Sequence, residues 1–98
     1  MSETAYQNKL SKKIKRLFPG AIVLKNDPDH IQGFPDLTVL YGPYWATLEV
    51  KADKGSRHQP NQDYYVETLD NMSFSAFIYP ENEEKVLNEL QLAFGVSR

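Results

Sequence analysis

The sequence predicts an α/β fold in which a mixed central sheet is flanked by helices. Apolar residues recur at helical spacing near both ends of the chain, and segments rich in β-branched and aromatic residues lie between them. Proline and glycine separate most of these segments. The 98 residues, 41% of them hydrophobic, suit one domain over residues 1–98 with a modest core. The predicted order of elements is α-β-β-β-α-β-α.

The first two elements are a helix and a short strand. Ser2 is a suitable N-cap for a helix over residues 3–18, which Pro19-Gly20 ends. The apolar run 21–24 predicts a strand, and the residues that follow it are rich in turn formers.

The next two elements form a predicted hairpin. Residues 36–41 and 44–52 are β-rich and flank Gly42-Pro43. A symmetric turn at Gly42-Pro43 pairs residues whose numbers sum to 85, which places Asp36 opposite Glu49. Directly opposed residues project to the same face of a sheet, so we expect the two carboxylates to meet.

The second half of the chain predicts a helix, a strand and a final helix. Pro60 suits the first turn of a helix over residues 60–69, and residues 74–79 predict a strand that Pro80 ends. Asn82 is a suitable N-cap for the last helix. Its predicted buried side consists of Val86, Leu87, Leu90 and Phe94.

The composition excludes several kinds of site. The chain has no cysteine, which rules out disulfides, thiolate zinc sites and cysteine nucleophiles. No apolar run reaches the ~18 residues of a membrane span, and the first residues are polar rather than signal-like. We therefore expect a soluble protein of the cytoplasm with no membrane partner.

Charge is divided unevenly along the chain. Residues 1–25 carry six basic side chains and one acid, a balance of +5; the whole chain has a net charge of −2, which leaves −7 for the rest. One sector of the predicted first helix collects Lys9, Lys12, Lys13 and Arg16. This sector would bind the phosphates of DNA, although the same pattern is common on solvated helix faces.

The two acids of the hairpin predict a metal site. Carboxylates whose β-carbons are ~5 Å apart repel each other unless a cation lies between them. Oxygen ligands favour Mg²⁺ or Mn²⁺, and the carbonyl of Val50 would add another oxygen. Lys51 points to the same side as Glu49, where its ammonium would touch a phosphate oxygen or orient a water. The alternative is an exposed face whose charges only pair with one another.

The segments around these residues carry a resemblance to a nuclease family. Gly33-Phe34-Pro35-Asp36-Leu37 and Leu48-Glu49-Val50-Lys51, with twelve residues between the two acids, resemble the PD-(D/E)XK motif. The likeness is strongest to the VRR-NUC branch and to small phage-type Holliday-junction resolvases, and it covers nearly the whole chain. Gln62 and Tyr65 resemble that branch's Gln-x-x-aromatic pattern, whereas Met72-Ser73 replaces a glycine that the family often has.

This resemblance implies a restriction-endonuclease-like fold and a Mg²⁺- or Mn²⁺-dependent endodeoxyribonuclease. Asp36 and Glu49 would be metal ligands, Lys51 would be catalytic, and Gln62 would support them. The resemblance also implies a branched DNA substrate and a phage-type protein acting inside a bacterial host. Because symmetric cutting of two strands needs two active sites, we expect a homodimer.

The family also places a glutamate on its first helix, and Glu3 is the matching residue. The helical phase agrees, since Glu3 falls within the apolar stripe of that helix and would face the site. The alternative is that Glu3 only complements the helix dipole from water.

The remaining candidates have two interpretations each. Lys54 and Arg57 lie in the loop after the catalytic strand and would hold the phosphate backbone, or they would only be solvated. The aromatic residues at the hairpin tip would pack against a second subunit rather than stack on an exposed base; these are Trp45, Tyr41 and Tyr44. Two other functions stay open, namely a non-catalytic DNA-binding module that uses the basic first helix and a protein-interaction domain.

Overall fold

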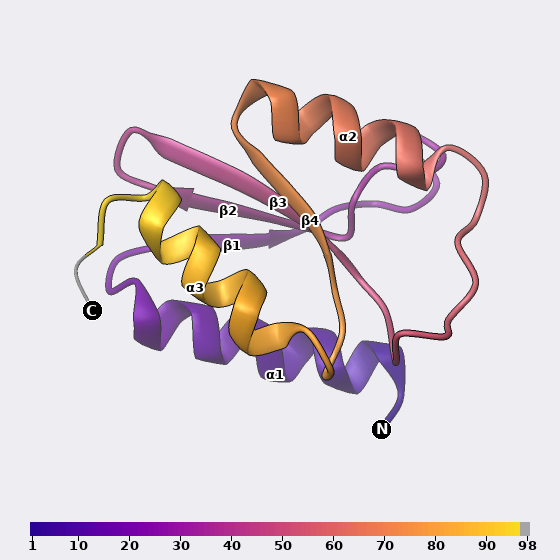
Figure 1. Cartoon of the computed structure of the whole chain (residues 1–98), viewed down its shortest axis with the longest axis horizontal. Coiled ribbons are helices and arrows are strands. Elements are labelled where there is room, and N and C mark those ends of the chain that lie inside the picture. The colour runs from indigo at the N-terminus through magenta and orange to yellow at the C-terminus, as the bar shows by residue number, and fades with distance from the viewer. Residues whose placement is uncertain (97–98) are drawn as a thin grey trace.

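The computed structural model describes residues 1–96, and four strands form one sheet at its centre (Figure 1). The elements, in order, are α1 (Glu3–Leu17), β1 (Ile22–Lys25), β2 (Leu37–Tyr41), β3 (Tyr44–Val50), α2 (Gln62–Met72), β4 (Phe74–Ile78) and α3 (Glu83–Ala93). The predicted order α-β-β-β-α-β-α is confirmed. No helix within residues 1–96 is long and apolar enough to cross a membrane.

The sheet is mixed, with strand order β1-β2-β3-β4. β1, β2 and β3 pair antiparallel, whereas β3 and β4 pair parallel. The two-residue connection at Gly42-Pro43 allows the antiparallel hairpin, and Gly42 adopts a positive φ of 57° there. A parallel pair requires a crossover connection, and α2 provides it between β3 and β4.

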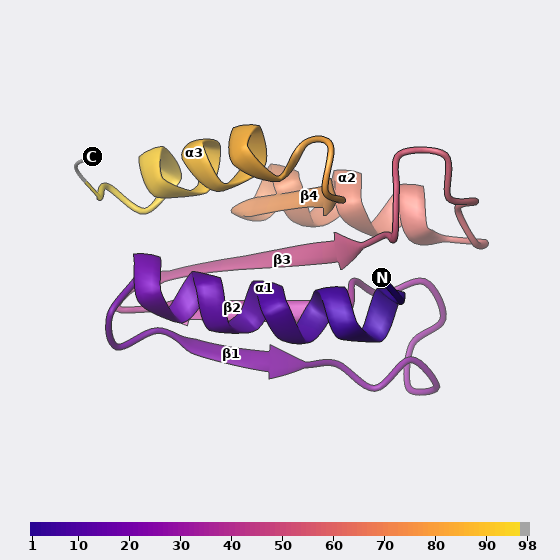
Figure 2. The same cartoon turned by 90° about the horizontal axis from the view of Figure 1, so that it is seen from below.

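The helices form two layers around the sheet. Figure 2 shows α1 and α3 in front of the sheet and α2 behind it. The core lies between the sheet and the α1–α3 layer, and its helical members are Tyr6, Leu10 and Ile14 of α1 and Val86, Leu87 and Leu90 of α3. Fully burying a side chain such as Leu10 or Ile14 stabilises the fold by about 1.5–3 kcal/mol. α2 buries only Leu69 and covers β3 and β4.

α1 begins at Glu3, as the sequence predicts, and ends at Leu17, one residue before the predicted end. The Ser2 side chain accepts a hydrogen bond from the backbone N–H of Ala5 at 3.1 Å, which satisfies one free donor of the first turn. Phe18 follows the last helical residue, is fully buried and packs edge-on against Tyr41 and Phe94. This aromatic cluster fills the end of the core next to the Gly42-Pro43 turn. It does not cover the opposite end of the sheet.

The predicted start of α2 was wrong. The helix begins at Gln62 rather than at Pro60, because Asn61 adopts a left-handed conformation with φ 72°. Gly33 lies so close to this turn that a β-carbon on it would be 2.7 Å from the carbonyl oxygen of Pro60. The loop before β2 therefore packs against the turn before α2, which the local pattern around Pro60 does not reveal.

The predicted capping hydrogen bond at the start of α3 was also wrong. Asn82 occupies the N-cap position, but its side chain makes no capping hydrogen bond to the helix. It accepts instead from the backbone N–H of Tyr79 at 2.9 Å and donates to the carbonyl of Phe77 at 3.0 Å. Asn82 thus holds the turn between β4 and α3, and the buried side of α3 follows the prediction.

Candidate active site

Asp36 and Glu49 meet where β2 begins and β3 ends. The hairpin has the predicted register, with Leu40 opposite Trp45 and Leu37 opposite Leu48. Asp36 lies one residue before β2, and its Oδ2 accepts a hydrogen bond from the backbone N–H of Val50 at 2.8 Å. This bond fixes the Asp36 carboxylate against the end of β3.

Glu49 is a buried carboxylate with an unsatisfied oxygen. Its side chain is almost fully enclosed, and Oε1 is buried with no hydrogen-bond partner in residues 1–96. Burial raises the pKa of Glu49 well above its ordinary value, and the charge and hydrogen bonding of Asp36 raise that pKa further, against a smaller opposing effect of Lys51. An unpartnered buried oxygen beside a second carboxylate is costly unless something else binds there.

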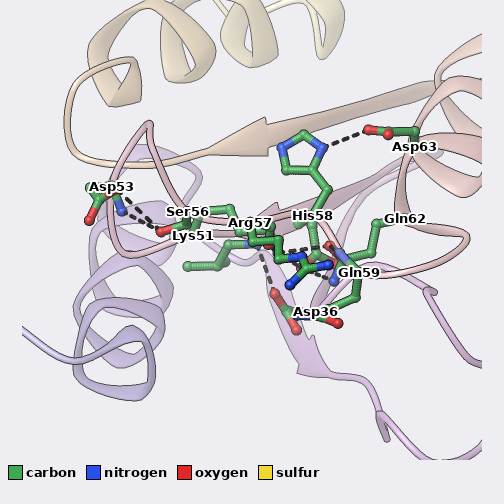
Figure 3. A network of polar contacts seen from close by, with 11 residues as sticks. Asp36, Lys51, Asp53, Ser56, Arg57, His58, Gln59, Gln62 and Asp63 are labelled. Atoms are coloured by element: carbon green, nitrogen blue, oxygen red, sulfur yellow. Dashed lines mark hydrogen bonds and ion pairs between the residues drawn. The ribbon is translucent and has the colours of Figure 1, made fainter.

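Lys51 is held by protein groups on several sides. It is only 5% exposed, and its Nζ donates to Oε1 of Gln62 at 2.7 Å and to the carbonyl of Arg57 at 3.1 Å (Figure 3). The same nitrogen lies 3.7 Å from Oε2 of Glu49. A lysine so enclosed is suited to neutralising charge within the site, with one N–H left for a water or a phosphate oxygen.

Gln62 joins the two halves of the site. Its Oε1 accepts from Lys51 and also from the backbone N–H of Gln59 at 2.8 Å, and its Nε2 donates to Oε2 of Glu49 at 3.0 Å. Because Gln62 is the first residue of α2, this amide connects that helix to β3. The structure therefore brings Gln62 into contact with the acid and the amine.

Glu3 approaches the same site from α1. It is exposed, and its pKa is raised, first by burial of part of the carboxylate and then by the charge of Asp36, with Lys51 acting in the opposite direction. Its carboxylate is thus within electrostatic reach of both residues. Within residues 1–96, however, no three histidine, cysteine, aspartate or glutamate side chains form a cluster able to hold a metal ion.

The loop between β3 and α2 is fixed by contacts that the sequence did not suggest. The His58 ring stacks on Phe77 with centroids 4.0 Å apart, and its Nδ1 lies 2.7 Å from Oδ1 of Asp63 (Figure 3). Nearby, Asp53 accepts hydrogen bonds from the backbone N–H of Gly55 and from the Ser56 hydroxyl. These contacts hold the backbone next to Arg57, whose carbonyl positions Lys51. No sequence spacing signals a stack between this loop and β4.

The predicted basic stripe of α1 is divided between two sides of the helix. Lys13 forms an ion pair with Glu83 of α3, so its charge is largely neutralised. Lys12, in contrast, lines a groove of about 370 Å³ between α1 and β1 together with Lys15 and Lys25. Lys9 and Arg16 are exposed, as are the loop residues predicted to contact phosphate, Lys54 and Arg57. Lys25 could not be assigned to this groove from helical phase, since it lies on a strand.

Comparison with solved structures supports the fold. The chain is similar to a structure described as a "VRR_NUC domain", with a TM-score of 0.70 and 22% sequence identity. The match covers 88% of this chain and 94% of that one. No protein-family model and no curated protein sequence matches. The chain therefore has the VRR_NUC fold that the motif around Asp36 and Glu49 predicted, as a mixed four-stranded sheet flanked by three helices.

Proposed function

We propose that the protein is a metal-dependent DNA endonuclease. The observation that carries this proposal is the buried Glu49, whose Oε1 has no partner in residues 1–96 and which adjoins Asp36. The similarity of the fold to a VRR_NUC domain supports a nuclease rather than a non-catalytic DNA-binding module.

The donors around Glu49 fit a hard divalent cation. Oxygens of Asp36 and Glu49, with the carbonyl of Val50, would hold Mg²⁺ or Mn²⁺, and water would supply the remaining ligands. The bound ion would polarise the scissile phosphate and favour ionisation of the attacking water. The Val50 N–H keeps the Asp36 carboxylate turned toward Glu49, so the backbone of β3 would orient both acids.

Lys51 and Gln62 would prepare the site for a phosphodiester. The Lys51 ammonium offsets the charge of the two acids and leaves one N–H for an attacking water or a phosphate oxygen. Gln62 would position both groups, because its amide accepts a hydrogen bond from Lys51 and donates one to Glu49. Glu3 would bind a water at the open side of the site, consistent with its exposure.

The basic groove between α1 and β1 would hold the DNA backbone. Its lysines Lys12, Lys15 and Lys25 have no ion-pair partner in residues 1–96. Lys54 and Arg57 would contact phosphates on the other side of the site. Contacts of this kind bind without regard to base sequence, so the substrate would be recognised by its shape, as expected for branched DNA such as a Holliday junction.

A homodimer would place two such sites on one branched substrate. An uncovered apolar face of the sheet supports this dimerisation. α2 covers β3 and β4 and leaves the apolar face of β1 and β2 exposed. Ile22 and Leu40 lie opposite each other there and are 56% and 37% exposed, with Leu24 beside them. A second copy would cover this face and remove it from water.

The proposed activity is tested by incubating the protein with labelled duplex, single-stranded and four-way-junction DNA, with and without Mg²⁺ or Mn²⁺. We expect metal-dependent cleavage of the junction, and Lys51→Ala should abolish it while DNA affinity changes little. Failure to cut any of the three DNAs with either metal would contradict the proposal. Cleavage of linear duplex and junction at equal rates would retain the nuclease and remove the structure specificity.

A further inference from the structure

A pocket with mainly apolar walls lies beside the proposed active site, in the loop between β1 and β2. It has a volume of about 290 Å³ and is lined by Asn26, Asp27, His30, Ile31 and Phe34. A second hollow of about 240 Å³ is lined by Asp36 and Gln62 of the site, and Phe34 forms a wall of both. A group bound in the first pocket would therefore be a close neighbour of a phosphate bound near Asp36.

Hydrogen bonds and packing fix the walls of this pocket without any ligand. The backbone N–H of Asn26 donates to the carbonyl of Asp36 at 2.8 Å, and its side-chain amide donates to Pro35 and Thr38. The Phe34 ring packs against Tyr65 of α2 with centroids 5.7 Å apart. A preformed cavity requires little reorganisation when a ligand enters.

The chemistry of the walls indicates a flat ligand with a polar edge. Of the residues that line the pocket, His30 and Phe34 are aromatic and Ile31 is aliphatic. A planar aromatic group stacks or packs on side chains of these kinds. Oδ1 of Asp27 accepts a hydrogen bond from the backbone N–H of Asp29, and within residues 1–96 no hydrogen bond engages Oδ2. A carboxylate oxygen accepts a hydrogen bond from the exocyclic amine of a nucleobase.

We propose that this pocket binds one unpaired base of the DNA, from the nucleotide next to the scissile phosphate. The inference rests on the proposed nuclease function and deepens it by naming the substrate feature that is recognised. A base inside a duplex enters a side pocket only after it is unstacked and unpaired, which costs free energy, whereas a nucleotide at a branch point or in a flap is already unpaired. The pocket would thus select DNA in which a nucleotide near the cut is already unpaired.

The carboxylate at the pocket edge predicts a preference among bases. Adenine, cytosine and guanine carry an exocyclic amine from which Asp27 would accept a hydrogen bond, and thymine has no such amine. We therefore expect thymine at this position to give the lowest affinity of the four bases. Asp27→Asn should reduce the difference in affinity between thymine and the other three.

The test compares Ile31→Trp, which fills the pocket, with Leu92→Trp, which adds the same ring to an exposed residue of α3 outside it. The substrates are flap oligonucleotides that carry either a base or an abasic residue next to the cut, and both affinity without metal and cleavage with Mn²⁺ are measured. For the base-containing flap, Ile31→Trp should weaken binding at least about fivefold, as loss of one stacked base predicts. For the abasic flap, Ile31→Trp, Leu92→Trp and the unmodified protein should bind equally.

The outcomes separate this inference from the nuclease proposal. If cleavage occurs but the abasic residue and Ile31→Trp have no effect, the pocket does not bind a base, while the nuclease proposal stands. If no metal-dependent cleavage occurs but base-dependent binding is lost in Ile31→Trp, the pocket is a base site and the enzyme proposal fails. Absence of any DNA binding would overturn both.

Discussion

The amide of Gln62 donates to the Glu49 carboxylate at 3.0 Å, and this contact ties helix α2 to the end of strand β3. The same amide accepts from Lys51 at 2.7 Å, so one side chain sets the positions of the acid and the amine. Gln62 is held in turn by the backbone N–H of Gln59. The candidate site therefore depends on a turn that lies outside both strands of its motif.

Replacing Gln62 with leucine, a side chain of similar size, should disable the site. Glu49 would lose its amide donor and Lys51 one of its two acceptors, and each unsatisfied buried group costs about 1–3 kcal/mol. We expect cleavage to fall at least about tenfold, since a change of 1.4 kcal/mol corresponds to that factor. Single-turnover kinetics on junction DNA would measure it. Gln91→Leu, on α3, is the matched control, and equal rates for both variants would remove the role of Gln62.

Glu49→Gln should have opposite effects on stability and on metal binding. Without metal, a neutral amide replaces a buried carboxylate that has an unpartnered oxygen, so we expect equal or higher thermal stability than for the unmodified protein. Divalent-metal binding, measured by calorimetry with Mn²⁺, should be lost. Asp36→Asn should also lose metal binding. Unchanged Mn²⁺ affinity in both variants would show that the ion, if bound, lies elsewhere.

Glu83 should stabilise the packing of α1 on α3 in a pH-dependent way. Burial alone would raise its pKa, but hydrogen bonds from Lys13 and from the Tyr6 hydroxyl outweigh burial, and the pKa is lowered below 4.5. Because the folded state favours the charged form, this stabilisation is complete above pH 4.5 and is lost as pH falls through the lowered pKa.

Glu83→Gln should therefore reduce the free energy of unfolding at pH 7 by roughly 1 kcal/mol, the usual contribution of a hydrogen bond. The loss should shrink as the pH is lowered below 4.5, when the carboxyl of the unmodified protein becomes protonated. Urea unfolding at a series of pH values would measure both effects, with the exposed Glu84→Gln as control. A destabilisation that does not change with pH would contradict the charged interaction.

Substituting the groove lysines should change the salt dependence of DNA binding. The triple variant Lys12→Gln, Lys15→Gln, Lys25→Gln removes three cations, so the slope of log affinity against log salt should fall by about 2–3. Lys13→Gln should have a smaller effect, because Lys13 is paired with Glu83. Lys85→Gln on α3 serves as the control. An effect of Lys13→Gln as large as that of the triple variant would favour the predicted helical stripe over the groove.

A charge on the uncovered sheet face should dissociate the proposed homodimer. Leu40→Glu places a carboxylate among apolar side chains of β1 and β2, where a second copy would have to bury it. We expect the unmodified protein to sediment as a dimer and the variant as a monomer that cuts one strand of a junction at a time. Leu92→Glu, at an exposed residue of α3, is the control. A monomeric unmodified protein would contradict the dimer itself.

Local patterns were sufficient for the elements and for the pairing of the hairpin. Ser2 caps α1, Gly42-Pro43 sets a register in which Leu40 faces Trp45, and that register brings Asp36 to Glu49. Each of these depends on residues close in sequence or joined by a two-residue turn, so periodicity and turn chemistry contain the necessary information.

The sequence by itself thus determined the order of the elements, the hairpin and the pair of acids that it presents. Only the tertiary structure decided that α2 begins at Gln62, that Lys13 is bound to Glu83, and that His58 lies on Phe77. It also placed Lys25 beside α1 and Phe34 between two pockets. The physical reason is that these contacts join separate elements, whose relative positions follow from packing of the whole core rather than from any local spacing.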